Sequence, residues 1–407
     1  MASVLRYGPD SSVKLEFAEG VLLAECGRPP ETACPPSAAV AETLSNPLDY
    51  PPLQQSIVAG DHVVVALESG VPQASEVVGV VVQTLVASGI APDGITVLRT
   101  QVDAEAGIGD PAPWLDPEVR KQITMVTHDP TDRQAMAYLA ATESGEPILL
   151  NRVLTDADIV LPVGCIQARP AGSFRNVASH VFPSFSNQRT LLRFRAVESR
   201  TAQAAQRKQL AEEVRQVGWL LGLTFTLQIV PGPGDRILHA LAGEYSAVRR
   251  RARELYEAAW RCSVPRRARL VVAGIEGGHA QQTWHNVGRA AAAAGALVED
   301  GGVIAICCDV ASEPGPAVQR LATASSREEA LRQIRKEHPA DALTAAQLAQ
   351  VLRRAKVYLL SRVNETLLED LEIAPITESE DLVRLTKRFD SCILLANAPR
   401  TMATAEE

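Results

Sequence analysis

Continuous apolar runs rich in β-branched residues alternate along this chain with segments of helical character. This alternation constrains the fold more than any other feature of the sequence. The first run is "DHVVVALES" (61–69), and "GITVLRTQ" (94–101) and "DADIVLPVG" (156–164) follow it. Unbroken apolar runs are typical of parallel strands that are buried on both faces. Helices between such strands imply parallel pairing with right-handed crossovers, so the first half of the chain predicts an α/β fold.

The middle of the chain has a different character. "AAQRKQLAEEVRQVGWLLG" (204–222) and "EYSAVRRRARELYEAAWRC" (244–262) predict two long amphipathic helices. Between them, "TFTLQIVPGPGDRILHALAG" (224–243) predicts a hairpin, because "PGPGD" supplies turn residues between two apolar strands. The middle of the chain therefore predicts a helical and hairpin segment over about residues 200–264.

A second set of apolar runs follows this segment. These runs are "LVVAGIEGG" (270–278), "GGVIAICCD" (301–309), "KVYLLSR" (356–362) and "SCILLAN" (391–397). We therefore predict two α/β domains with parallel-type sheets, an N-terminal domain over residues 1–264 and a C-terminal domain over residues 265–407. In open α/β sheets ligands bind outside the carboxyl ends of the strands. The predicted site is a cleft between the two domains.

Charge and cysteine usage limit the partners and the compartment. The chain has 48 acidic against 40 basic residues, a net charge of −8, so we predict neither nucleic acid nor an anionic membrane as a partner. The sequence shows no signal-peptide pattern and no apolar run long enough to span a membrane, so we expect neither a signal peptide nor a membrane span. The seven cysteines are scattered, which is typical of a cytoplasmic protein. Cys307 and Cys308 are adjacent in a strand and are predicted to be core residues.

Two long stretches carry a resemblance to a known family. They are "THDPTDRQAMAYLAATESGEPILLNRVLTDADIVLPVG" (127–164) and "GIEGGHAQQTWHNVGRAAAAAGALVEDGGVIAI" (274–306). In this order and at this spacing they resemble the lactate racemase family, whose founding enzymes carry a covalently tethered nickel-pincer nucleotide. The resemblance implies the family's two-domain α/β fold. It also implies an isomerase acting on a small 2-hydroxy acid or sugar acid.

The catalytic positions depart from the family pattern G-x-x-x-P-H-x-x-A-G-F-S-G-G-x-K-x-x-x-P-G. The residues that match it are Gly164, Phe174 and Pro183. The family's acid/base histidine falls on Arg169, and its cofactor-binding lysine falls on Ser179. Its nickel-ligating histidine falls near Phe194 or Arg195, and its earlier catalytic histidine falls near residues 101–103.

These replacements have chemical consequences. Arg169 cannot act as a general base, since a guanidinium does not release its proton in proteins. Ser179 has no amine for covalent attachment, and the chain has no lysine between Lys121 and Lys208. We therefore predict no nickel-pincer nucleotide, no metal and a mechanism different from that of the family.

Several residues of the first domain are candidate site residues. Arg169 and Arg175 flank the loop that follows the third predicted strand. They can bind a carboxylate or phosphate, or they can be solvated surface arginines. Glu68 ends the first long strand and can bind a ligand or simply be solvated. Ser179 is a candidate ligand-binding residue. His180 is a candidate catalytic residue, a displaced metal ligand, or a loop histidine bonded to the backbone.

The segment 274–286 is the most site-like part of the second domain. Gly277 and Gly278 follow a strand and permit close backbone approach to a ligand, and a helix N-terminus that favours anions comes next. The alternative is a purely structural strand-to-helix turn. The polar side chains available for binding are His279, Gln282, His285, Asn286 and Arg289.

One further histidine stands beside a predicted helix. Residues 129–145, "DPTDRQAMAYLAATESG", predict a helix that Asp129 caps, with Pro130 at its first position. His128 is then either a turn residue or a catalytic group.

Three functional hypotheses stay open. The first is an isomerase of the lactate racemase type with a changed mechanism or cofactor. The second is a non-catalytic relative that binds a small anionic molecule, a carboxylate or a phosphate, or that partners an active paralogue. The third is a different enzyme that uses His180, His279 or His285 in the same cleft. Self-association into a homo-oligomer is compatible with each of them.

Overall fold

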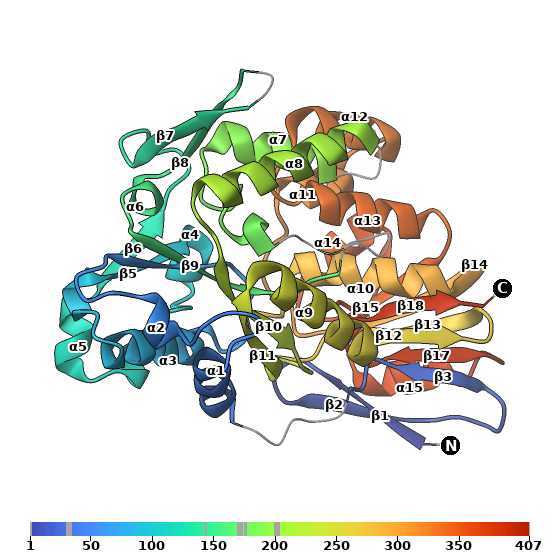
Figure 1. Cartoon of the computed structure of the whole chain (residues 1–407). Coiled ribbons are helices and arrows are strands. Elements are labelled where there is room, and N and C mark those ends of the chain that lie inside the picture. Colours follow the sequence, from blue (N-terminus) through green and yellow to red (C-terminus); the bar gives the residue numbers. More distant parts are fainter. Residues whose placement is uncertain are drawn as a thin grey trace.

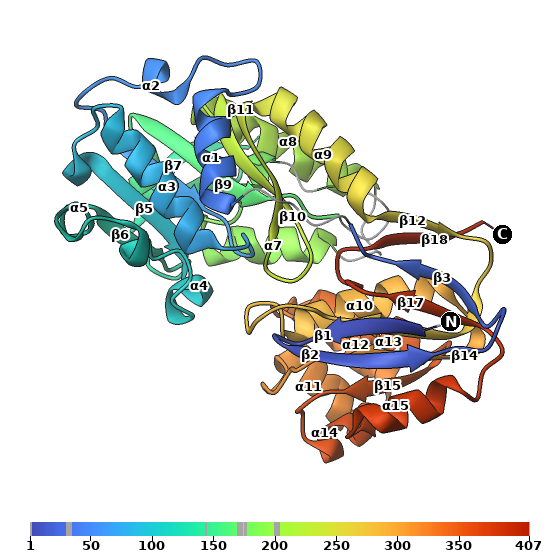
Figure 2. The ribbon, with the colours of Figure 1, turned by 90° about the horizontal axis from the view of Figure 1, so that it is seen from below.

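The computed structural model describes residues 2–29, 35–142, 145–168, 174, 177–198 and 204–406. It consists of two lobes, each built on one six-stranded sheet with helices on its faces (Figure 1, Figure 2). The two-domain α/β fold predicted from the sequence is confirmed. No helix of the described ranges is both long and apolar enough to cross a membrane.

The first sheet is parallel except at one edge, where β11 runs antiparallel to β10. All five residues of β4 are buried, as the unbroken apolar run predicts. In spatial order the strands are β11 (Ile237–Glu244), β10 (Phe225–Pro231), β9 (Ile159–Cys165), β4 (Val63–Leu67), β5 (Ile95–Thr100) and β6 (Thr124–His128).

The second sheet is parallel throughout. In spatial order its strands are β16 (Ile373–Ile376), β15 (Lys356–Leu360), β14 (Val298–Cys307), β13 (Ala268–Gly274), β17 (Cys392–Leu395) and β3 (Leu22–Cys26). Cys307 and Cys308 are both buried in this lobe, as predicted.

The N-terminal strands pack on the second sheet. The antiparallel pair β1 (Ala2–Tyr7) and β2 (Ser11–Glu16) contributes Leu5 and Leu15 to a core that also contains Leu270 of β13. The domain boundaries predicted from the sequence stay predictions. The chain nevertheless begins in the second lobe, crosses to the first lobe after β3, and returns after residue 260.

Helices cover both sheets and connect their strands. In the first lobe they are α1 (Pro36–Ser45), α2 (Leu53–Ser56), α3 (Ala74–Ala87), α4 (Gln101–Glu105), α5 (Pro117–Gln122), α6 (Arg152–Thr155), α7 (Gln188–Glu198), α8 (Ala204–Leu220) and α9 (Tyr245–Trp260), with the short turns η1 (Pro92–Gly94), η2 (Ala112–Trp114) and η3 (Val177–His180). In the second lobe they are α10 (Trp284–Leu297), α11 (Pro316–Thr323), α12 (Arg327–Glu337), α13 (Ala342–Leu352), α14 (Glu365–Asp370) and α15 (Ser379–Thr386).

The helix predicted over residues 129–145 is wrong. The segment forms β7 (Met136–Ala141), which pairs antiparallel with β8 (Pro147–Asn151). Asp129 accepts hydrogen bonds from the N–H and the hydroxyl of Thr131, which closes a local turn in place of a helix cap. The pairing partner that follows in the sequence supplies the backbone hydrogen bonds, so tertiary context overrides the local helical preference.

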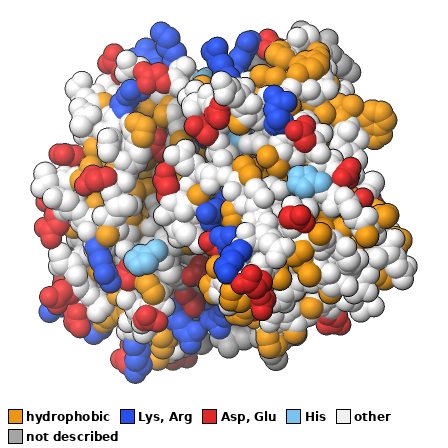
Figure 3. Space-filling model, turned by 90° about the vertical axis from the view of Figure 1, so that its left-hand side faces the viewer, with side chains coloured by type: hydrophobic (Ala, Val, Ile, Leu, Met, Phe, Trp, Pro, Cys, Tyr) orange, Lys and Arg blue, Asp and Glu red, His pale blue; other side chains and the backbone are white. Residues whose placement is uncertain are grey.

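The surface carries charges of both signs. Figure 3 views the left-hand side of Figure 1, where acidic and basic side chains are interspersed with small apolar patches. This mixture agrees with the modest net charge of −8.

A disulfide joins the two crossings between the lobes. Cys26 ends β3, and Cys262 lies in β12 (Arg261–Val264), which pairs with the C-terminal strand β18 (Met402–Ala405). The two cysteines are 236 residues apart in the sequence. The pairing was not predicted, because scattered cysteines carry no signal of which two meet in space.

We expect the disulfide to be detectable in the purified protein. Thiol titration in denaturant should find two fewer thiols without reductant than after reduction. Cys262→Ser should lower the free energy of unfolding under oxidising conditions by about 2–4 kcal/mol, because it frees a long loop in the unfolded state. Under reducing conditions the variant and the wild type should melt alike. Equal thiol counts before and after reduction would contradict the disulfide.

Candidate functional site

Each sheet has one point at which the order of its strands reverses. In the first sheet the reversal lies between β4 and β9, and in the second sheet between β13 and β17. Ligands of open α/β sheets bind outside the carboxyl ends of the strands at such switch points. The fold therefore defines two candidate positions.

The first switch point is filled by a buried histidine and carboxylate. Glu68 directly follows β4, and His180 ends η3, with Nε2 of the imidazole 3.2 Å from Oε2 of Glu68. His180 is fully buried and Glu68 is 3% exposed. Gly164 in β9 makes room for the ring, since a Cβ there would lie 1.8 Å from Nδ1 of His180. The structure thus brings together Glu68 and His180, two predicted site residues.

A second buried carboxylate lies beside this pair. Asp103 of α4 is 2% exposed and accepts hydrogen bonds from the hydroxyls of Ser69 (2.8 Å) and Thr100 (2.7 Å). Burial raises the pKa of Asp103, the two hydroxyls and Arg99 oppose this, and the negative charge of Glu68 raises it further. The sequence signal for this residue was the family position of a catalytic histidine near residues 101–103, where the chain offers an acid instead.

The segment that carries His180 is held by the surrounding helices. The N–H of Ala178 donates to the hydroxyl of Tyr245 at 3.2 Å. Ser179 is buried, and its carbonyl accepts a hydrogen bond from Ser184 at 2.9 Å. Arg169 and Arg175, which were predicted to bracket a bound anion, lie outside the described residues.

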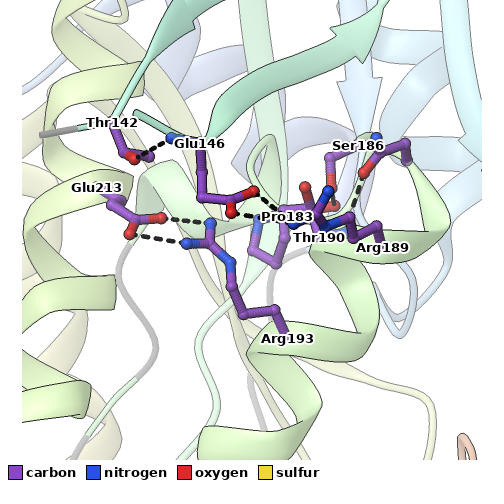
Figure 4. A network of polar contacts seen from close by, with 9 residues as sticks. Thr142, Glu146, Pro183, Ser186, Arg189, Thr190, Arg193 and Glu213 are labelled. Carbon is purple, nitrogen blue, oxygen red and sulfur yellow. Dashed lines mark hydrogen bonds and ion pairs between the residues drawn. The ribbon is translucent and has the colours of Figure 1, made fainter. Parts of the chain in front are cut away.

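Ion pairs fix α7, which follows this segment. The guanidinium of Arg193 donates to both carboxylate oxygens of Glu213 in α8, at 2.9 and 2.5 Å. Arg189 pairs with Glu146 of the β7–β8 hairpin at 2.9 Å (Figure 4). Glu213 is buried, so its bidentate pairing with Arg193 compensates the loss of solvation. These ion pairs hold α7 against α8 and the β7–β8 hairpin, next to the segment that carries His180.

A carboxylate of the first lobe, that of Asp235, occupies the second switch point. Gly277 and Gly278 follow β13, and the N–H of Gly278 donates to the carboxylate of Asp235, which lies in the turn between β10 and β11. Gly277 and Gly278 were predicted to approach a ligand. In the structure the group that they approach is a carboxylate of the same chain.

The remaining polar groups of residues 274–286 do not converge. Asn286 is buried and donates to the carbonyl of Gln281 at 2.9 Å. Gln282 is buried and donates to the carbonyls of Ile275 (3.1 Å) and Gly277 (2.8 Å). His279 and His285 are exposed, whereas His180 is buried in the first lobe. In the described part of the chain, no three His, Cys, Asp or Glu side chains are grouped to hold a metal.

The charges of two arginines of the second lobe act on Cys165, the last residue of β9. Arg289 projects from α10, and Arg400 follows β17 and donates to the carbonyl of Gly232. Burial lowers the pKa of Arg400, and the positive charge of Arg289 lowers it further. Burial raises the pKa of Cys165 to about 12, and both arginines oppose that rise. A thiol with this pKa is protonated at neutral pH, so Cys165 is not a nucleophile here.

Tyr256 of α9 contacts Arg400. Its hydroxyl donates to the carbonyl of Arg400 at 2.7 Å. Burial raises the pKa of Tyr256, while the charges of Arg289 and Arg400 oppose the rise. Among the described residues no carboxylate is paired with Arg289. The sequence reasoning found Arg289 but missed Arg400 and Tyr256, because nothing local to them indicates that they meet residues of the other lobe.

His128 is a buried residue that contacts Ser186 and Asn151. It ends β6 and is 3% exposed, and its Nε2 lies 3.0 Å from the carbonyl of Ser186 while Nδ1 lies 3.2 Å from the amide of Asn151. Burial lowers its pKa, so it is neutral in the folded protein near pH 7.

Comparison with known proteins agrees with this architecture. Residues 7–205 match the family model of the lactate racemase N-terminal domain. The lactate racemase apoprotein of Thermoanaerobacterium thermosaccharolyticum superposes with a TM-score of 0.76 at 16% identity, over 99% of this chain and 100% of that chain. A protein from Thermotoga maritima superposes with a TM-score of 0.61 at 15% identity, over 94% and 100% of the two chains. No curated protein matches the chain.

The structure defines a two-domain α/β protein with the fold of the lactate racemase apoprotein. In residues 7–205 the chain is similar to the lactate racemase family, as its resemblance predicted. The solved structures are too distant in sequence to show more than a shared fold.

The packing of His180 against Gly164 gives a direct test of the first switch point. Gly164→Ala should destabilise the protein by about 1–3 kcal/mol, because the new methyl group would collide with the imidazole. In a His180→Ala background the same substitution should cost much less. Denaturant unfolding of the four proteins measures this coupling, and equal costs in both backgrounds would show that His180 does not occupy the space beside Gly164.

Proposed function

We propose that this protein binds a small carboxylate of the 2-hydroxy acid or sugar acid class at the junction of its lobes. We further propose that it does so without a nickel-pincer nucleotide. The proposal rests on Arg400, which contacts Tyr256 and the carbonyl of Gly232, and on the charge of Arg289, which acts on Arg400, Cys165 and Tyr256. The charge of Arg289 lowers the pKa of Arg400 while the carboxylate of Asp235 raises it, and a bound anion would further offset the repulsion between the two guanidinium groups.

The chemistry of the pair fits a carboxylate. An arginine fork accepts both oxygens of a carboxylate in parallel hydrogen bonds. Arg289 has no acidic partner in the described part of the chain, so its donors are available to a ligand. Arg400 already donates to the carbonyl of Gly232, which fixes its position before a ligand arrives.

The residues of the first lobe do not fit the family's tethered cofactor. Ser179, at the position of the attachment lysine, is buried and has a hydroxyl in place of an amine. Phe194, near the position of the nickel-ligating histidine, packs edge-on against Phe182 with the ring centroids 5.2 Å apart. An aromatic ring and a serine hydroxyl supply neither the covalent link nor a nickel ligand. The chemistry of the family's cofactor is therefore not part of the proposal.

An isomerase without that cofactor is the second candidate. The contact between His180 and Glu68 favours it, because a carboxylate that orients an imidazole is a common arrangement for a general base. Against it stands the burial of both side chains, which leaves the imidazole no surface through which to meet a substrate. Interconversion of D- and L-lactate by the wild type that His180→Ala abolishes would establish this alternative.

Ligand binding tests the proposal directly. We expect titration calorimetry to show binding of D- or L-lactate to the wild type. Arg289→Gln should weaken it about tenfold to a hundredfold, because a charge-assisted bidentate contact is lost. Arg332→Gln is the matched control, since Arg332 is an exposed arginine of α12. Equal affinities of all three proteins would place any bound anion elsewhere.

The cofactor part of the proposal has its own test. The protein should be produced in cells that also make the nickel-pincer nucleotide, beside a lactate racemase that retains the attachment lysine. We expect the racemase to carry a mass adduct and nickel, and this protein to carry neither by intact mass and metal analysis. Stoichiometric nickel in this protein would refute that expectation.

A further inference from the structure

The turn between β10 and β11 leaves the first lobe and reaches the second (Figure 2). It is internally rigid, because the N–H of Gly232 donates to the carbonyl of Arg236 at 2.7 Å and the N–H of Arg236 donates to the carbonyl of Pro233 at 3.1 Å. The indole of Trp260 donates to the carbonyl of Pro231 at 3.0 Å and anchors its base. Two prolines fix the backbone further.

We call residues 232–236 the docking turn. The polar contacts with the second lobe that join described residues meet the carboxyl edge of β13 or β17, which is the switch point of that sheet. The contacts are Asp235 with the N–H of Gly278, Arg236 with Glu276 at 3.3 Å, the N–H of Gly234 with Asn397 at 3.2 Å, and the carbonyl of Gly232 with Arg400.

The glycines of the second lobe are shaped to admit the carboxylate of Asp235. A Cβ at Gly278 would lie 3.0 Å from one oxygen of that carboxylate, and a Cβ at Gly277 would lie 3.2 Å from each. Gly277 also has a φ of +118°, which side chains rarely adopt. A small anion held by backbone N–H groups at a strand-to-helix turn is the usual ligand arrangement of such domains. Here the anion belongs to the protein.

We propose that the docking turn is an interdomain latch, in which Asp235 occupies the anion position at the switch point of the second sheet and holds the two lobes closed. The latch includes the contact of Arg400 with the carbonyl of Gly232. It also closes the second switch point to external anions. The inference stands on these contacts alone and does not depend on the ligand proposed above.

The covalent crossings between the lobes lie beside the docking turn. The chain crosses after β3 and again through β12, and the Cys26–Cys262 disulfide joins these two crossings. Asn397, which accepts from the N–H of Gly234, also donates to the carbonyl of Gly27, next to Cys26, at 3.0 Å. Loss of the contacts at the docking turn would leave these crossings and the hydrogen bond of Tyr256 to the carbonyl of Arg400 as links between the lobes, so we expect the lobes to move more freely relative to one another.

Hydrogen exchange measured by mass spectrometry tests the contact. In Asp235→Ala, amides of both residues 231–237 and residues 275–282 should exchange about tenfold faster or more than in the wild type, since a charge-assisted bond between them is lost. Asp132→Ala is the matched control, because Asp132 also accepts an N–H in an exposed turn but stays within its own lobe. Faster exchange in residues 231–237 alone would overturn the latch and leave Asp235 as a residue that shapes its own turn.

Small-angle X-ray scattering tests the closure. The radius of gyration should increase in Asp235→Ala and in Arg236→Gln, and most in the double variant, with unchanged helical circular dichroism. Arg236→Gln provides a second test if Asp235→Ala does not fold, because Arg236 is exposed and pairs with Glu276 of the second lobe. A radius of gyration equal to that of the wild type in every folded variant would overturn the proposal.

Discussion

Two parallel sheets, each buried on both faces, leave only the ends of their strands for polar chemistry, and the rest of this structure follows from that constraint. Inner strands such as β4 and β17 consist of apolar residues or cysteine and are buried along their whole length. Polar and charged side chains therefore gather where the strands end. The order of the strands then singles out one place in each sheet, between β4 and β9 and between β13 and β17.

Both of these places are occupied by groups of the chain itself. In the first lobe the imidazole of His180 lies against Glu68 in the space that Gly164 leaves open. In the second lobe the carboxylate of Asp235 lies against Gly278. Contacts within the chain thus close both switch points. The arginines at the junction remain as the groups suited to an external anion.

The sequence predicted a large part of this arrangement. Long apolar runs identified β4, β5 and β9, and the "PGPGD" turn identified the hairpin of β10 and β11. The helix predicted over residues 129–145 was wrong, because pairing with β8, which follows directly in the sequence, outweighs the helical preference of the segment. Of the candidate site residues, Glu68 and His180 meet one another, and Gly278 meets Asp235. Arg400 and Tyr256 were missed because their neighbours come from distant parts of the chain.

By itself the sequence determined the fold class and the similarity to the lactate racemase N-terminal domain, since these depend on residue types and their order. Only the tertiary structure decided that β3 lies in the second sheet, that Cys26 meets Cys262, and that a turn of one lobe fills the switch point of the other. Such contacts join residues far apart in the sequence, 43 positions for Asp235 and Gly278 and 236 for Cys26 and Cys262. Their free energy depends on the packing of whole domains, which no local pattern of residues encodes.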